Sequence, residues 1–174
     1  TLSGDVALSN NATAHILTVT GTGNTTVSGN ISNGSTSVSG ITKAGSGTLS
    51  LSGTNNFTGA VAVSNGTLAL SGGAALDDTV NLTLSATGAL TLNASETVGS
   101  LTGVAANTIT LNSNSTLTSN TAASTSFLGN ITGSGGLTKA GAGTLTLAGT
   151  NSYSGPTTIN AGAISAGVLA NGGA

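Results

Sequence analysis

The feature that most constrains this chain is an internal repeat that is present in two copies. Residues 41 to 66 read ITKAGSGTLSLSGTNNFTGAVAVSNG, and residues 137 to 162 read LTKAGAGTLTLAGTNSYSGPTTINAG. The two segments align without a gap, and half of the aligned positions are identical. Self-similarity at this level indicates a repeat architecture, in which each unit buries its apolar face against its neighbours.

Within each copy, a shorter period separates equivalent apolar residues. Leu49 and Leu68 have the same sequence separation as Leu145 and Ile164, and we interpret this separation as the coil length. Leu49 and Leu51 flank a serine, and this alternation of apolar and small polar residues is typical of short, half-buried strands. Clusters such as Ser-Gly, Asn-Gly and Gly-Thr-Asn indicate the turns between strands. We therefore predict an all-β, parallel β-solenoid with about 20 residues per coil and roughly eight or nine coils.

Stacking of coils brings like residues onto like positions. We expect columns of Leu and Val inside and rows of Ser, Thr and Asn outside, where side-chain amides can form hydrogen-bonded ladders. Phe57 and Tyr153 share one repeat position and are expected to fill the core or a corner. Lys43 and Lys139 share another. We interpret them as solvated charges that prevent lateral association of a hydrophobic stack, with an anchoring or recognition charge as the alternative.

The composition excludes most classes of chemistry. The 174 residues include 28 Gly, no Cys, Met or Trp, two Lys or Arg and four Asp or Glu, and the formal net charge is −2. So few positive charges and 2% aromatic residues argue against a nucleic-acid partner. No apolar run approaches the roughly 20 residues of a membrane span. We expect no enzyme, no catalytic residue, no cofactor and no metal site. The absence of cysteine is compatible with export in an unfolded state and equally with a reducing cytosol.

The few ionisable residues leave two catalytic alternatives. His15 with Asp5 and a serine could form a triad, but nothing resembles a nucleophile elbow, and we interpret His15 as an exposed or edge residue. Asp77-Asp78 could match the carboxylate pairs of glycan-cleaving β-helices. Adjacent residues on a strand face opposite sides, however, so we interpret the pair as a turn in an inserted loop. Glu96 is the fourth acidic residue, and the four are spread along the chain.

The repeats resemble a known family. The pattern T-K-x-G-x-G-T-L-x-L-x-G-x-N-x-[FY]-x-G-x-[TV]-x-[IV]-x-x-G, present at 42–66 and 138–162, is similar to the autotransporter-associated β-strand repeat, also called the passenger-associated transport repeat. The resemblance implies a right-handed parallel β-helix in a long bacterial surface protein, exported by the type V route through an outer-membrane translocation barrel. It also implies roles in secretion and stalk-like scaffolding, and offers no catalytic residue to carry over. The general right-handed bias of parallel crossovers agrees with this handedness.

We interpret residues 1–174 as a single solenoid that forms a fragment or repeating unit of a longer surface protein. The segment 1–3 begins in strand-like sequence, and the segment 168–172 ends without the polar cap that an isolated solenoid needs. The expected function is non-catalytic: an extracellular stalk or fibre at the bacterial cell surface. Self-stacking into filaments, with a second copy as the partner and assembly either end to end or lateral, is the sharper form of this hypothesis.

Two other functions stay open at this stage. An adhesin or ice-binding solenoid would bind through Thr/Ser/Asn-rich faces, because segments 18–20, 108–110 and 116–118 contain Thr-x-Thr steps, although these do not recur in every coil. A polysaccharide-degrading enzyme on a β-helix would need clustered carboxylates, which the sequence lacks.

Overall fold

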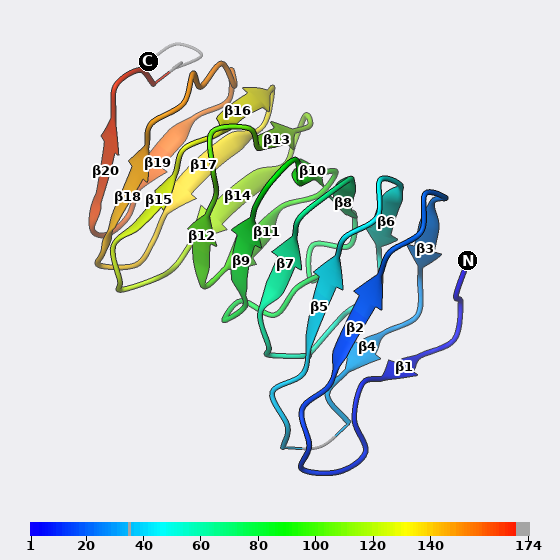
Figure 1. Ribbon diagram of the computed structural model, residues 1–174. Coiled ribbons are helices and arrows are strands. Elements are labelled where there is room, and N and C mark those ends of the chain that lie inside the picture. Colours follow the sequence, from blue (N-terminus) through cyan, green and yellow to red (C-terminus); the bar gives the residue numbers. More distant parts are fainter. Residues whose placement is uncertain (35, 170–174) are drawn as a thin grey trace.

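The computed structural model describes residues 1–34 and 36–169 as a β-solenoid of about eight turns (Figure 1). The strand pairs are parallel, and their register gives the coil length. Coils are longest near the N-terminus, where Val6 pairs with Ile31, and shorter further along, where Leu90 pairs with Ile109. Each of the two equal spacings found in the sequence corresponds to one coil, because Leu49 pairs with Leu68 and Leu145 pairs with Ile164 in the next coil. The predicted coil of about 20 residues is confirmed.

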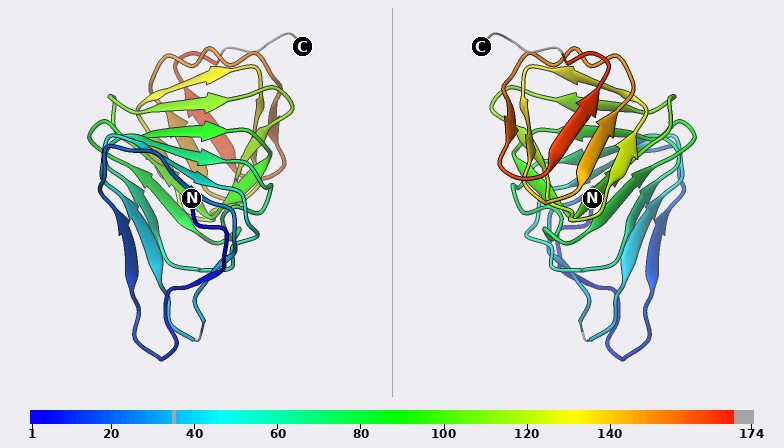
Figure 2. Two further views of the ribbon diagram at one scale, coloured as in Figure 1. Left: turned by 90° about the vertical axis from the view of Figure 1, so that its right-hand side faces the viewer. Right: turned by 90° about the vertical axis from the view of Figure 1, so that its left-hand side faces the viewer.

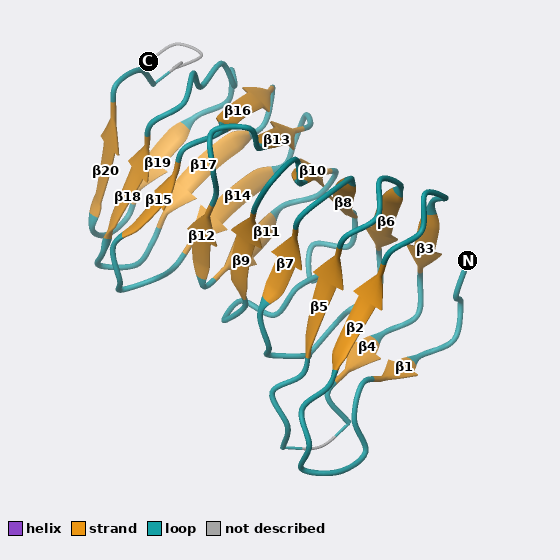
Figure 3. Cartoon of the chain, in the orientation of Figure 1, coloured by secondary structure: helices purple, strands orange, loops and turns teal. Residues whose placement is uncertain are grey.

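Each turn has three faces, and their order fixes the handedness. Seen from the N-terminal end, the chain runs up the face that contains β2 (Ile16–Val19), which we call face 1. It then crosses the face that contains β3 (Thr25–Val27), face 2, and returns along the face that contains β4 (Ile31–Ser32), face 3. The path is clockwise as the chain recedes from the viewer (Figure 2). The solenoid is therefore right-handed. No helix occurs in the described ranges, where strands alternate with loops and turns (Figure 3).

The strands of each face follow one another along the axis. Face 1 contains β2 (Ile16–Val19), β5 (Gly40–Lys43), β7 (Val61–Val63), β9 (Asn81–Leu84), β12 (Ser100–Thr102), β15 (Thr125–Phe127), β18 (Thr144–Leu147) and β20 (Ala163–Ala166). Face 2 contains β3 (Thr25–Val27), β6 (Thr48–Leu51), β8 (Thr67–Leu70), β10 (Ala89–Leu92), β13 (Thr108–Leu111) and β16 (Asn130–Gly133). Face 3 contains β1 (Val6–Ala7), β4 (Ile31–Ser32), β11 (Glu96–Val98), β14 (Thr116–Ser119), β17 (Gly136–Lys139) and β19 (Thr157–Ile159).

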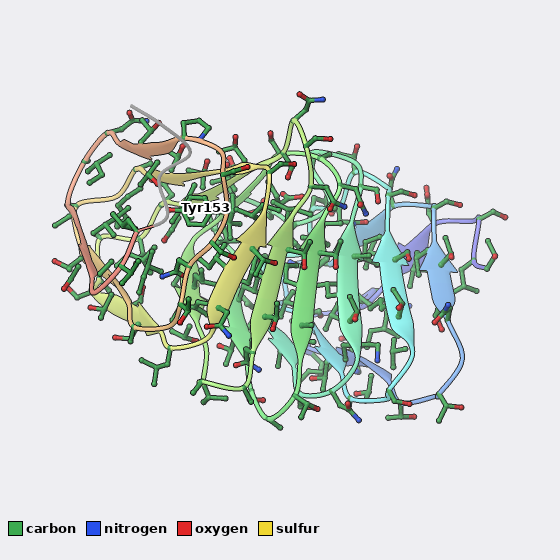
Figure 4. All side chains as sticks on the ribbon, turned by 90° about the horizontal axis from the view of Figure 1, so that it is seen from above. Tyr153 is labelled. Carbon is green, nitrogen blue, oxygen red and sulfur yellow. The ribbon has the colours of Figure 1, made fainter. Side chains whose placement is uncertain are left out.

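The core consists of aliphatic columns that run along the axis. On face 2 each inward side chain stands in register on the next, as in the column Leu49, Leu68, Leu90, Ile109 and Ile131. All five are at most 1% exposed. Alternate positions carry Thr and Ser outward, because successive side chains of a strand point to opposite sides. The expected inner columns and outer polar rows are confirmed, and Figure 4, in which the solenoid is seen from above, shows side chains with oxygen and nitrogen atoms around its outside.

Face 3 is interrupted between β4 and β11. There the segments 52–60 and 71–80 pass along the face without forming a strand. They still continue the ladder, because the Asn56 N–H donates to the Ile31 carbonyl and the Asn55 N–H donates to the Ala74 carbonyl. The C-terminal segment 168–172, for which we expect no polar cap, lies partly outside the described residues.

Candidate functional site

The two repeat copies occupy different faces of the solenoid. In the first copy, β5 and β7 lie on face 1, β6 and β8 lie on face 2, and the segment around Asn55 crosses face 3. In the second copy, β17 and β19 lie on face 3, β18 and β20 lie on face 1, and Asn151 lies on face 2. The copies begin at 41 and 137, and this interval is not a whole number of turns. The second copy is therefore turned by one face relative to the first.

The interpretation of Lys43 and Lys139 as solvated charges is wrong. Their side chains are 1% and 0% exposed. Each lysine lies two residues after an inward aliphatic residue, Ile41 or Leu137, and so points to the same interior side of its strand. Its methylene stem can pack with the core while its ammonium reaches the polar main chain at the corner.

Main-chain carbonyls at the corners accept the hydrogen bonds of both ammonium groups. Lys43 Nζ donates to the carbonyl of Gly45, and also to that of Asn65, at 3.3 Å, in the next coil. Lys139 Nζ donates to the corresponding Gly141 carbonyl. Burial lowers the pKa of both ammonium groups, because the charged form loses hydration. The alternation of inward and outward positions along each strand could have predicted that both lysines are buried, whereas their charge predicted that they are exposed.

A glycine with positive φ completes each of these corners. Gly66 has φ +68° and Gly162 has φ +71°, values that L side chains rarely adopt. A Cβ on Gly66 would lie 2.4 Å from the Gly45 carbonyl oxygen and 2.8 Å from Lys43 Nζ. The absence of a side chain therefore leaves room for the ammonium and its acceptors.

The repeat asparagine replaces strand hydrogen bonds where a coil has no strand. Asn55 Oδ1 accepts the Ile31 N–H at 2.6 Å, and Asn55 Nδ2 donates to the Ala75 carbonyl at 2.7 Å. One side chain thus joins the coil before it to the coil after it. In the second copy, Asn151 Oδ1 accepts the Ile131 N–H at 3.2 Å.

Both repeat aromatics are fully buried, which confirms that they fill the core. They differ in one hydrogen bond. The Tyr153 hydroxyl lies 2.6 Å from Thr157 Oγ1, and Tyr153 sits within the C-terminal coils (Figure 4). In the first copy Phe57 and Val61 hold these two positions, and both lack the hydroxyl. Burial raises the pKa of Tyr153, although the hydrogen bond with Thr157 opposes the shift.

Glu96 is a buried carboxylate that the sequence analysis did not single out. It lies on β11, is 3% exposed, and its Oε2 accepts the Ala75 N–H at 2.9 Å. Its Oε1 is buried without a hydrogen-bond partner. Its pKa is raised from 4.5 to about 7, mainly by burial; the nearby Asp78 carboxylate contributes to the rise, and main-chain hydrogen bonds oppose it. Glu96 lies two residues before the buried Val98 on a short strand, and this alternation was the sequence signal that could have predicted its burial.

The other candidate residues have local structural roles. Asp77 Oδ1 accepts the Thr79 N–H at 2.9 Å within a turn, which confirms the interpretation of the pair as a turn. His15 is exposed directly before β2, as expected for an edge residue. Asp5 Oδ1 accepts the Asn30 N–H at 2.8 Å. Within the described ranges, no hydrogen bond joins the His15 imidazole to the Asp5 carboxylate.

Polar side chains on the outer surface form the expected ladders. Asn112 Nδ2 donates to Asn93 Oδ1 at 2.7 Å, and Asn93 Nδ2 donates to Ser71 Oγ at 3.2 Å, so one ladder spans three coils. On face 1, the Thr102 and Thr83 hydroxyls are hydrogen-bonded at 3.1 Å. Face 2 presents one continuous outward row, which is Thr26, Ser50, Ala69, Thr91, Thr110 and Thr132.

A groove of about 470 Å³ lies at the N-terminal end of the solenoid. Val6, Leu8, Ile16 and Leu17 contribute apolar side chains to it, and Ser9 and His15 contribute polar ones. Val6, Leu8 and Leu17 pack on the core from one side but stay partly exposed. The groove is thus the uncovered end of the apolar columns.

No group of three or more His, Cys, Asp or Glu side chains in 1–34 and 36–169 is placed to hold a metal ion. Within the same ranges, no helix has the length and apolar character needed to cross a membrane.

Comparison with known proteins identifies the repeats. The passenger-associated-transport-repeat family matches residues 41–70 and 137–166, which contain the two copies described above. No curated protein and no solved structure matches the chain. The repeats and the solenoid together support a surface-protein β-solenoid, secreted or displayed at the cell surface.

Proposed function

We propose that this solenoid, which carries two passenger-associated transport repeats, is a non-catalytic stalk or fibre segment of a bacterial surface protein. Its role is mechanical: it holds other parts of the surface protein away from the cell or builds a surface layer. The observation that carries the proposal is the continuity of the aliphatic columns, in which each coil rests on the next in register. Such a stack extends by adding coils and needs no further core.

The sequence also suits assembly outside the cell. The chain has no cysteine and only 3% charged residues, so no disulfide restrains the unfolded chain during passage through an outer-membrane translocation barrel. Each coil that forms outside offers an unpaired strand edge on which the next coil can pair. The inward lysines and asparagines then satisfy the corner carbonyls as each coil closes.

The sharper form of the proposal is end-to-end stacking. The open groove at the N-terminal end exposes Leu8 and Leu17, which belong to inward columns, and a terminal coil of a second copy would cover them. Burial of such a face is favourable by about 25 cal/mol per Å² of apolar surface.

Electron microscopy at moderate concentration tests this stacking. We expect filaments with a regular axial repeat, and Leu17→Arg should abolish them because it places a charge on the apolar end. Thr18→Arg is the matched control, because Thr18 lies next to it on the exposed side of β2. Circular dichroism checks that both variants keep their strands. Discrete short rods from the unsubstituted chain would contradict stacking and leave the spacer role.

A second candidate function rests on the outward row of face 2. Six coils contribute to this row, with hydroxyls on all but the one at Ala69. A regular hydroxyl array suits an adhesin or an ice-binding surface. Thermal hysteresis and glycan-array binding test these two forms, and Thr91→Lys with Thr110→Lys should remove either activity. Activity that survives both substitutions would contradict a role for this row.

A further inference from the structure

One corner of the first repeat copy brings the atoms of a spontaneous modification together. Asn65 and Gly66 form the turn between β7 and β8. Gly66 has φ +68°, and its N–H donates to Asn65 Oδ1 at 2.8 Å. This contact places the Gly66 main-chain nitrogen beside the carbon of the Asn65 side-chain amide. That nitrogen and that carbon are the two atoms that join when an asparagine cyclises to a succinimide.

A cationic donor activates the nucleophile. Lys43 Nζ donates to the Asn65 main-chain carbonyl at 3.3 Å, and this carbonyl belongs to the same peptide group as the Gly66 nitrogen. A buried positive charge on the oxygen stabilises the negative charge that develops in the peptide group when the nitrogen loses its proton. Lys43 is 1% exposed, so water screens this effect little.

A hydroxyl donor activates the electrophile. Thr87 Oγ1 donates to Asn65 Oδ1 at 3.1 Å from the next coil. This oxygen gains negative charge as the nitrogen attacks, so the hydroxyl stabilises the tetrahedral intermediate in the manner of an oxyanion donor. Asn65 itself is half-buried, which leaves the amide accessible to water.

We propose that Asn65–Gly66 is a site of self-promoted deamidation that the folded corner accelerates. The Gly66 nitrogen gives its proton to a solvent base and bonds to Asn65 Cγ. The Cγ–Nδ2 bond then breaks, and Nδ2 takes up a proton and leaves as ammonia. Water opens the resulting succinimide at one of its two carbonyls, giving aspartate or isoaspartate at position 65. The product carries a new carboxylate at the corner that holds the Lys43 ammonium.

The chain contains internal controls for this proposal. In the second copy, the corresponding corner has Ala161 before Gly162, so it retains the glycine and the lysine but lacks the amide. Asn33–Gly34 has the same dipeptide, but Asn33 Oδ1 accepts the Ser39 N–H at 3.1 Å and Asn33 Nδ2 donates to Thr58 Oγ1 at 3.0 Å. These two hydrogen bonds hold the Asn33 side-chain amide in place. A third Asn–Gly pair, at 171–172, lies outside the described residues.

Peptide mapping after incubation at mildly alkaline pH tests the proposal. Trypsin cleaves after Lys43 and Lys139, so the three Asn–Gly pairs fall in three different peptides. We expect peptide 44–139 to gain the mass of an amide-to-acid conversion at Asn65, with ammonia released. The reaction at Asn65 should be faster in the folded protein than in the same protein unfolded in urea. Asn33 should show the opposite order.

Substitutions separate activation by the fold from the intrinsic reactivity of the dipeptide. We expect Lys43→Met to slow the reaction in the folded protein roughly tenfold, whereas Lys139→Met should leave the rate unchanged. Intact-mass fragmentation localises the change in these variants, which lack a tryptic site. Thr87→Val, at an exposed position, should also slow the reaction, and Thr102→Val is its matched control. Thr87→Val provides the test of activation by the fold if Lys43→Met does not fold.

Two results would overturn the proposal. One is a rate at Asn65 in the folded protein that does not exceed the rate in urea. The other is a rate that both Lys43→Met and Thr87→Val leave unchanged in the folded state.

Discussion

The two repeat copies have the same corner chemistry on different faces of the solenoid. The first has its lysine at the end of β5 on face 1, and the second at the end of β17 on face 3. In both, the lysine is buried, its ammonium bonds the carbonyl two residues on, and a glycine with positive φ closes the corner. The repeat therefore specifies a strand, a corner and the next strand, and does not specify a side of the solenoid.

The copies differ in the neighbouring coil that each ammonium contacts. Lys43 donates forward to Asn65 in the following coil, and Lys139 donates backward to Thr121, at 3.2 Å, in the preceding coil. A buried cation needs oxygen acceptors, and stacked corners offer them from both directions. The lysine thus links adjacent coils by means of whichever corner carbonyl the local stacking brings within reach.

The copies also differ in how well the following coil covers them. Val63 in β7 is 0% exposed, whereas the equivalent Ile159 in β19 is 51% exposed.

The first prediction, with the largest expected effect, tests this difference by truncating the repeat aromatic. Phe57→Ala should lower the free energy of unfolding by about 3–5 kcal/mol, because it leaves a cavity in a covered core. Tyr153→Ala should cost less in global stability, because the last coils can open locally.

Urea denaturation of both variants measures the two losses. Hydrogen exchange of β19 and β20 then shows whether the second copy opens first. Equal losses from the two substitutions would contradict the distinction and indicate that the solenoid unfolds as one unit to its C-terminal end.

The second prediction concerns the coil between the copies, where Glu96 lies. Its pKa rises from 4.5 to about 7 in the folded state, so folding favours the protonated form. Stability is therefore highest below pH 4.5, falls as pH rises through about 7 and then levels off. The loss is at most roughly 3 kcal/mol. Burial of the carboxylate is the main cause of this loss, the Asp78 carboxylate contributes to it, and main-chain N–H groups of the segment 75–76 and of Thr97 oppose it.

Urea midpoints across this pH range, measured for the unsubstituted chain and for Glu96→Gln, test the prediction. The glutamine should flatten the profile because it cannot ionise. Above neutral pH the two copies should also unfold less cooperatively, since coupling between coils depends on their interface. A profile that Glu96→Gln leaves unchanged would assign the pH dependence to other groups.

The third prediction compares the buried lysines. Lys43→Met and Lys139→Met keep much of the apolar stem but leave corner carbonyls without their donor. Each should lower the free energy of unfolding by about 1–3 kcal/mol. Thr42→Met and Thr138→Met, at adjacent outward positions, are the matched controls and should have little effect on chemical denaturation. Unaltered stability in both lysine variants would show that water satisfies the carbonyls equally well.

The smallest expected effect concerns the hydroxyl pair that only the second copy contains. Tyr153→Phe should destabilise by about 1 kcal/mol, because Thr157 loses its buried partner. In the Thr157→Val background the same change should be nearly neutral, since Phe57 and Val61 occupy these positions in the first copy. A double-mutant cycle in urea measures the coupling. A coupling near zero would contradict an energetic role for the hydrogen bond.

Much of the fold could be predicted from the sequence because its signals are local and repeated. Leu49 and Leu51 alternate with polar residues, so their inward orientation followed from strand parity. Parity also placed Lys43 on the inside, but its charge favoured the opposite interpretation. One of the carbonyls that accept from its ammonium, that of Asn65, belongs to a corner of the next coil, which no local pattern identifies.

The sequence by itself determined the strand content, the coil length and the burial of the repeat aromatics, because period-two alternation and a repeat of fixed length express them directly. Only the tertiary structure decided which face each copy occupies, because that depends on the summed lengths of coils that are longer near the N-terminus than further along. It also decided the partners of Glu96, Asn65 and both lysines. Apart from the Gly45 and Gly141 carbonyls and the Gly66 N–H, those partners come from neighbouring coils, and the stacking register of the whole chain brings them into contact.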